Sequence, residues 1–190
     1  VAVWSSYEVV TLWVFANDYI PMLDWEAHPV YFVLLFCAIP IIRDAHFYFV
    51  HRMLHYRWLY RPVHQLHHKN MDIGPWSGMS MHPIEHILYF SGALLHWVLL
   101  SHPIHVIFHL QATGLTPAMG HVGYHKWMKK DGTGASIGQR YFHYLHHRYF
   151  ECNYGGDGTV PLDKWFGTWH DGTLESHREM RGKRKETHGI

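Results

Sequence analysis

The sequence predicts an all-α integral membrane protein, with about four transmembrane helices in two hairpins beneath a helical cytoplasmic cap that holds a histidine-ligated dimetal site. Three observations lead to this prediction. Apolar residues gather in four stretches. The basic residues all fall on one side of the predicted membrane. The chain has 21 histidines among 190 residues, and many of them recur at helical spacing.

The four apolar stretches are the predicted membrane helices. They are Val1–Ala16, Val30–Ile42, Ile84–Leu100 and Ile104–Gly120. The last two contain 17 residues each, which gives a helix of about 25 Å, near the lower limit for crossing the hydrocarbon core. Four buried helices of a soluble bundle are the alternative interpretation.

The distribution of charge favours the membrane. The predicted connections on one side, residues 17–29 and 101–103, contain no Lys or Arg. All 16 basic residues, from Arg43 to Lys185, lie on the other side. Loops rich in Lys and Arg stay in the cytoplasm, so the basic face is predicted to be cytoplasmic. The expected location is the endoplasmic reticulum if the protein is eukaryotic and the inner membrane if it is bacterial.

Length and composition predict a single domain over residues 1–190, of which 173–190 form a charged tail. The chain begins at Val1 and not at a methionine, which leaves open that its N-terminus is incomplete. The 16 basic and 15 acidic residues nearly balance, so no bulk charge points to nucleic acid as a partner.

Ten histidines are the candidate metal ligands. They form two H-x-x-x-H pairs and two H-x-x-H-H groups, and residues three or four apart share one helix face. The adjacent histidine of each H-x-x-H-H group points about 100° away, so it can serve a second ion. The ten candidates are His51, His55, His64, His67, His68, His121, His125, His143, His146 and His147.

Ten imidazoles suit two ions with about five ligands each. A catalytic zinc ion usually takes three protein ligands and a structural one takes four. Imidazole binds iron, zinc, copper and nickel, so the ligand type alone does not identify the metal. Sites rich in nitrogen with an open position favour a redox metal.

Six further residues are candidates for supporting the ligands without binding the metal. Carboxylates and amides there would orient ligand imidazoles. Asp44 has an equal alternative, an ion pair with Arg43 or Arg52, and the spacing of His82 and His86 also allows direct ligation. The six candidates are Asp44, His46, His82, Glu85, His86 and Asn153.

Several large side chains between the histidine groups are candidates for a lipid channel, with plain helix packing as the alternative. They are Trp76, Met79, Met81, Tyr89, Phe90 and Trp97.

Seven sequence motifs resemble the fatty acid hydroxylase and sterol desaturase superfamily. The resemblance covers about residues 30–172, and the combination of motifs is highly specific. The motifs are D-A-H-F-Y-F-V-H-R-M-L-H (44–55), H-Q-L-H-H-K (64–69), M-H-P-I-E-H (81–86), G-H-V-G-Y-H (120–125), H-Y-L-H-H-R-Y-F (143–150), N-Y-G (153–155) and P-L-D-K-W-F-G-T (161–168).

The resemblance implies that the ten histidines hold two iron ions, with zinc able to substitute. It further implies that O2 is the co-substrate and that a C–H bond of a fatty acyl, sterol or carotenoid lipid is hydroxylated or desaturated. Electrons would come from a separate donor, such as cytochrome b5 with its reductase or a ferredoxin. No catalytic residue beyond the ligands is implied. In one departure, three residues separate His51 and His55 where some members have four.

Two other functions compete with this interpretation. The first is a non-catalytic family member that serves as a structural subunit of a larger membrane complex. The second is a zinc hydrolase, which would use three or four ligands and a nearby general base. Ten intact ligands argue against both. The sequence does not identify the lipid or the position that would be oxidised.

Overall fold

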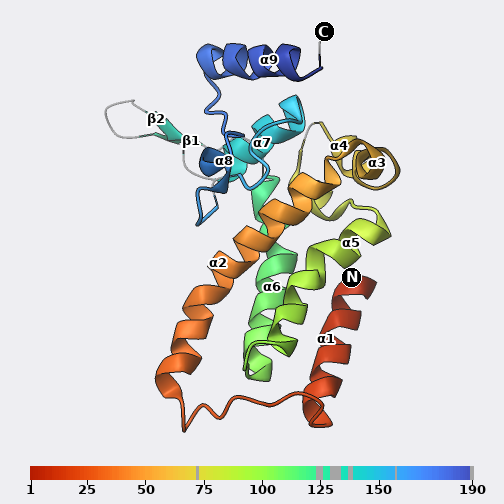
Figure 1. Ribbon diagram of the computed structural model, residues 1–190, viewed down its shortest axis with the longest axis vertical. Coiled ribbons are helices and arrows are strands. Elements are labelled where there is room, and N and C mark those ends of the chain that lie inside the picture. The colour runs from red at the N-terminus through yellow and green to blue at the C-terminus, as the bar shows by residue number, and fades with distance from the viewer. Residues whose placement is uncertain (72, 123–125, 129–133, 137–138, 157, 189–190) are drawn as a thin grey trace.

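The stem of the protein is built from four helical segments. The computed structural model describes the chain except for residues 72, 123–125, 129–133, 137–138, 157 and 189–190. Figure 1 shows the segments side by side in an elongated stem. They are α1 (Ala2–Ala16), α2 (Pro29–Leu54), α5 (Pro83–Phe90) continued by the 3₁₀ helix η3 (Ser91–Trp97), and α6 (Pro103–Gly120).

Short elements form a cap at one end of the stem (Figure 1). Within the described residues the only strands are a three-residue antiparallel pair, which the sequence did not predict. The cap elements are α3 (Arg57–Leu59), the π-helical η1 (Tyr60–His64), α4 (Gln65–His68), the 3₁₀ helix η2 (Pro75–Met79), β1 (Lys126–Met128), β2 (Gly134–Ser136), α7 (Gln139–Tyr149), α8 (Leu162–Trp165) and α9 (Leu174–His188).

The stem helices are connected as two hairpins. Both the α1–α2 connection and the η3–α6 connection lie at the end of the stem away from the cap (Figure 1). The backbone N–H of Leu23 donates to the carbonyl of Ser101 at 2.9 Å, which joins these two connections. The four predicted apolar stretches therefore occur as four helical segments, although Ile84–Leu100 is divided between α5 and η3.

The stem helices differ in how well their length and composition suit a membrane-spanning segment. By length and composition, α2 is the one helix among the described residues that is long and apolar enough to cross a bilayer, and α1 is apolar but shorter. Proline stands in the first turn of α2, α5 and α6, where its missing N–H costs no hydrogen bond.

The interior of the stem is an aromatic and aliphatic core. It comprises Phe15, Tyr89, Phe90, Ala93, Val106 and Leu110. Helices α1 and α6 approach so closely at Gly114 that a Cβ atom there would lie 2.4 Å from the Trp4 ring. Glycine is therefore required at this contact.

A proline near the cap end of α6 ties this helix to α5. Pro117 has no N–H, so the carbonyl of Thr113 loses its helical partner. The hydroxyl of Tyr89 donates to that carbonyl at 2.9 Å. Gly78 of η2 packs directly on Pro117, since a Cβ at Gly78 would lie 2.5 Å from the Pro117 carbonyl oxygen. These contacts fix the end of α6 that leads into the cap.

Candidate metal centre

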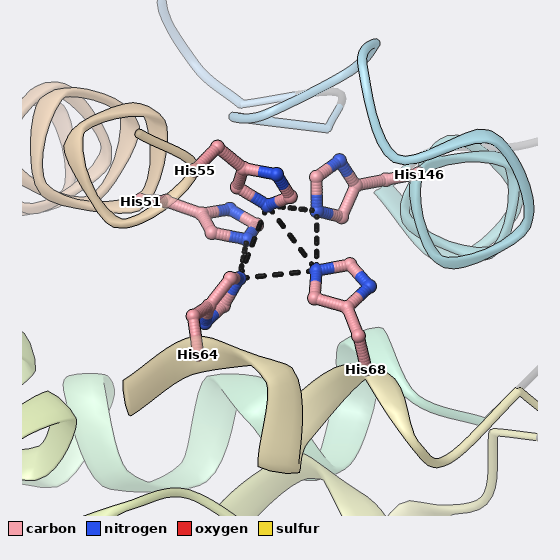
Figure 2. A group of neighbouring side chains, drawn as sticks. All are labelled: His51, His55, His64, His68 and His146. Atoms are coloured by element: carbon pink, nitrogen blue, oxygen red, sulfur yellow. Dashed lines mark hydrogen bonds between the residues drawn. The ribbon is translucent and has the colours of Figure 1, made fainter. Parts of the chain in front are cut away.

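Nine of the ten candidate ligands converge where the stem meets the cap, and they form two groups. Within each group the nearest nitrogen atoms all lie within 4.8 Å of one another. The tenth candidate, His125, lies outside the described residues. The five-histidine group, drawn in Figure 2, is His51, His55, His64, His68 and His146. The four-histidine group is His67, His121, His143 and His147.

Helical spacing explains how each H-x-x-H-H motif is divided. His64 and His68, four residues apart, point into the five-histidine group, whereas His67 belongs to the other group. In α7 the division is reversed, because His143 and His147 join the four-histidine group and His146 crosses to the five-histidine group. Residues four apart share a helix face and their neighbour is turned by about 100°. Each motif therefore links the two groups.

The spacing of nitrogen atoms in the five-histidine group fits the ligands of a single ion. Six pairs of Nε2 atoms lie 3.0–3.2 Å apart, as the dashed lines in Figure 2 show. With metal–nitrogen bonds of about 2.1 Å, right-angled ligands would lie about 3.0 Å apart and tetrahedral ligands about 3.4 Å apart. The observed distances lie between these two values, as expected for nitrogen atoms that bind one ion.

Backbone carbonyls determine which ring nitrogen carries the proton. His51 Nδ1 lies 2.6 Å from the Tyr154 carbonyl oxygen, and His146 Nδ1 lies 2.6 Å from that of Cys152. In the four-histidine group, His121 Nδ1 lies 2.7 Å from the Pro117 carbonyl oxygen. A carbonyl can only accept, so each Nδ1 donates and each Nε2 presents a lone pair. Converging lone pairs repel one another unless a cation lies between them, and the donor set therefore fits metal ions.

Burial keeps the imidazoles of the cap neutral. It lowers the pKa of His121 to about 4. The pKa of His147 is lowered to about 3, by burial first and then by the charge of the neighbouring His121. Burial, followed by the charges of other histidines, holds the pKa of His143 and His146 well below 6.5. Neutral imidazole is the form that binds a metal ion, so protons compete weakly with metals here.

The loop around Asn153 holds two candidate ligands at once. Its neighbours Cys152 and Tyr154 supply the carbonyls that accept from His146 and His51. Asn153 has a φ of 51°, in the left-handed region that asparagine tolerates better than most residues. Its side chain is fully buried and exchanges two 2.8 Å hydrogen bonds with the backbone of His170. Asn153 therefore supports these two candidate ligands through the loop.

The two candidate carboxylates differ in their contacts. Glu85 Oε1 lies 2.8 Å from Nδ1 of His64, with both side chains buried. Asp44 pairs with Arg43, and its Oδ2 accepts 2.7 Å hydrogen bonds from both the N–H and the hydroxyl of Thr159. The ion pair predicted between Asp44 and Arg43 is thus present in the structure.

The three remaining supporting candidates hydrogen-bond elsewhere among the described residues. His46 lies 3.0 Å from the hydroxyl of Ser91, and His86 lies 3.2 Å from the Met79 carbonyl. His82 caps α5 by accepting from the backbone N–H of Ile84. Residue spacing alone did not distinguish these three from Glu85.

A cavity of about 60 Å³ lies between the stem and both histidine groups. Imidazoles of each group border it, together with apolar side chains of α2, Tyr89 of α5 and the charged side chains of Arg43, Asp44 and Glu85. Met81 and Tyr89 are the two channel candidates that line it, whereas Trp76 is 95 % exposed. The residues that line it include His51, His64, His67, His121, His143, Phe47, Val50, Leu54, Met81 and Tyr89.

Sequence reasoning missed Phe47 and the carbonyls of Cys152 and Tyr154. A signal for Phe47 existed, because it precedes His51 by four residues and so shares its helix face. Backbone carbonyls carry no signal in a sequence, since every residue has one.

The fold and the site define a helical protein with two buried polyhistidine groups at the cap end of an apolar stem. The chain belongs to the fatty acid hydroxylase family, whose sequence profile matches residues 36–168. No solved structure gives a significant match.

Curated relatives carry names of sterol-modifying proteins. The chain is 28 % identical to a Delta(7)-sterol 5(6)-desaturase of Candida glabrata over 70 % of this chain and 36 % of the relative. It is 27 % identical to methylsterol monooxygenase 1 of Gallus gallus over 85 % of this chain and 55 % of the relative. It is 28 % identical to a Delta(7)-sterol-C5(6)-desaturase of Nicotiana tabacum over 93 % of this chain and 63 % of the relative. The chain thus spans between about a third and three fifths of these relatives.

Proposed function

We propose that the protein oxidises a C–H bond of a membrane lipid, by hydroxylation or desaturation, at two iron ions held by the two histidine groups. One observation carries this proposal: two sets of converging imidazole nitrogens border the same apolar-lined cavity. Sterols are the first substrates to test, because the relatives are named sterol desaturases and methylsterol monooxygenases. A fatty acyl chain is the second.

The chain and the metal ions have separate tasks in this reaction. The two ions, when bound, supply the activation of O2 and the power to oxidise an unactivated C–H bond. The backbone carbonyls at Cys152, Tyr154 and Pro117 keep the ligand lone pairs aimed inward. Apolar side chains such as Phe47 and Leu54 exclude water from the cavity and align the lipid. A separate protein, such as cytochrome b5 with its reductase or a ferredoxin, delivers the electrons.

The proposal includes a membrane topology. Helices α1, α2, α5 with η3, and α6 lie in the membrane as two hairpins, with the histidine groups on the cytoplasmic side. Support comes from the sorting of the basic residues and from the outer surface of α2. Val30, Val33 and Leu34 there are 71 %, 58 % and 59 % exposed, as expected for side chains that face lipid.

The reaction can be tested directly. The purified protein is loaded with iron, supplied with a reducing system and presented with sterols or with fatty acyl lipids. The expected result is O2 consumption coupled to an oxidised lipid, identified by mass spectrometry. Tight binding of two metal ions without any oxidised product would contradict the proposal and favour the structural-subunit alternative.

The ligand assignment has its own test. Replacing His146 with alanine removes one nitrogen from the five-histidine group and also disrupts the edges to His55 and His68. We expect His146→Ala to lower the metal content from two ions per chain to about one, measured by elemental analysis. His86→Ala is the matched control, because His86 hydrogen-bonds the Met79 carbonyl and belongs to neither group. Two retained ions in His146→Ala would refute the assignment.

A further inference from the structure

A second set of histidines lies inside the stem, away from the five-histidine and four-histidine groups. His96 of η3 and His109 of α6 are each only 2 % exposed. His96 Nδ1 lies 2.8 Å from the hydroxyl of Ser101, and His96 Nε2 lies 3.1 Å from His109 Nδ1. These three side chains form a hydrogen-bonded row that starts at the connection between η3 and α6, the end of the stem opposite the cap (Figure 1).

The row continues toward the cap past a glycine against which both His109 and His46 pack. A Cβ atom at Gly92 would lie 3.3 Å from Nε2 of His109 and 3.1 Å from Nδ1 of His46. Both imidazoles therefore pack closely against Gly92. His46 in turn lines the cavity that borders both histidine groups, and its Nε2 lies 3.0 Å from the hydroxyl of Ser91.

Chemistry and placement both indicate a role beyond packing. Ionisable side chains inside a membrane are costly and most often serve ion or proton pathways. Imidazole can accept a proton at one ring nitrogen and release one from the other, so a row of imidazoles can pass protons along. Apolar side chains would pack these helices without that cost.

We propose that His96, His109 and His46 form a proton relay from the far end of the stem into the cavity beside the two histidine groups, completed by a water molecule that bridges His109 and His46 beside Gly92. This inference rests on the proposed function. Hydroxylation combines R–H, O2, two electrons and two protons to give R–OH and water. Desaturation uses the same O2, electrons and protons to give an alkene and two waters. Either reaction consumes two protons in the cavity beside the two histidine groups, with the protein electron donor supplying the electrons.

The first test uses metal-free protein, so it does not depend on activity. Exchange of the ring N–H protons of His96 and His109 with deuterium is followed by nitrogen-15 NMR in lipid nanodiscs. We expect both protons to exchange much faster than the backbone amides of α6, and Gly92→Ala to slow exchange at His109. Ring protons as protected as the helix amides would show a purely structural hydrogen bond and would overturn the proposal.

The second test uses iron-loaded protein without lipid. Proton uptake during anaerobic reduction is measured with a pH-sensitive dye. We expect His109→Gln, which can hydrogen-bond but cannot relay a proton, to slow uptake at least about ten-fold. His105→Gln is the matched control, because His105 is also buried on α6 but bonds the Phe32 carbonyl and the His102 backbone instead. Equal rates in the two variants would refute the relay.

The two proposals can fail separately. Normal, His109-dependent proton uptake without any lipid product would refute the proposed function and leave the relay in place. Lipid oxidation at the wild-type rate in His109→Gln, with unchanged proton uptake, would refute the relay and leave the proposed function in place. If iron does not bind, the exchange measurement on metal-free protein still decides whether the row passes protons.

Discussion

A single carboxylate orients one of the candidate ligands. Glu85 is buried and lies 2.8 Å from Nδ1 of His64, whose Nε2 contacts those of His51, His55 and His68. A carboxylate in this place fixes the ring and makes its other nitrogen a better donor to a metal. The effect of Glu85 should therefore appear in metal affinity.

We expect Glu85→Ala to weaken binding at the five-histidine group by about 10- to 100-fold, with Glu85→Gln intermediate because an amide oxygen still accepts. Competition with a chelator measures the affinity. Glu26→Gln, at an exposed position in the α1–α2 connection, should leave it unchanged. An unaltered affinity in Glu85→Ala would show that His64 does not need this partner.

At the scale of elements, the close packing of η2 on α6 positions the four-histidine group. Gly78 touches the Pro117 carbonyl, and that carbonyl accepts from His121 Nδ1 at 2.7 Å. A methyl group at residue 78 would have to displace backbone and not a flexible side chain. The displacement would pass directly to His121.

We expect Gly78→Ala to weaken metal binding at the four-histidine group more than at the five-histidine group, and to lower stability by about 1–3 kcal/mol. Two-site titration and thermal unfolding in detergent measure the two effects. Gly182→Ala, on exposed helix α9 with nothing near its added Cβ, is the control. Equal weakening of both groups would contradict the local effect.

The helices could be predicted from the sequence better than their ends. Each apolar stretch predicted one helical segment, because a run of apolar side chains is visible without neighbours. The helix predicted from Val30–Ile42 continues to Leu54, past the apolar run, and so carries His51 to the cap. The break at Ser91, where α5 gives way to a 3₁₀ helix, had no clear signal, since it depends on packing against other helices.

For the whole molecule, the sorting of charge makes the topology testable. Residues 26 and 175 are both exposed, one in the α1–α2 connection and the other in α9. In a background with Cys37 replaced by alanine, a membrane-impermeant thiol reagent applied from the non-cytoplasmic side should label Glu26→Cys and spare Glu175→Cys. Labelling of Glu175→Cys, or of both, would contradict the proposed orientation.

The buried histidines also make stability depend on pH. His121 and His147 have pKa values of about 4 and about 3 in the folded protein because burial disfavours their charged forms, against about 6.5 when unfolded. Between these values the unfolded state binds more protons, so stability falls as the pH is lowered. Each such histidine changes the free energy of unfolding by up to about 1.4 kcal/mol per pH unit in this range.

We therefore expect the metal-free protein to unfold at a lower denaturant concentration at pH 5 than at pH 7, followed by circular dichroism. Bound metal should reduce this difference, because ligated nitrogens no longer take up protons. Equal midpoints at the two pH values without metal would show that these imidazoles are not buried in the folded state.

The sequence by itself determined the helical segments, the histidines that could share a face, and the family, because these depend on residue type and spacing along one chain. Only the tertiary structure decided which imidazoles belong to which group, since His146 lies in α7 and its partners lie 78 to 95 positions earlier. It also decided that Glu85 contacts the candidate ligand His64, whereas Asp44 pairs with Arg43. Such choices depend on how separate helices pack, and residue spacing within a helix carries no information about that.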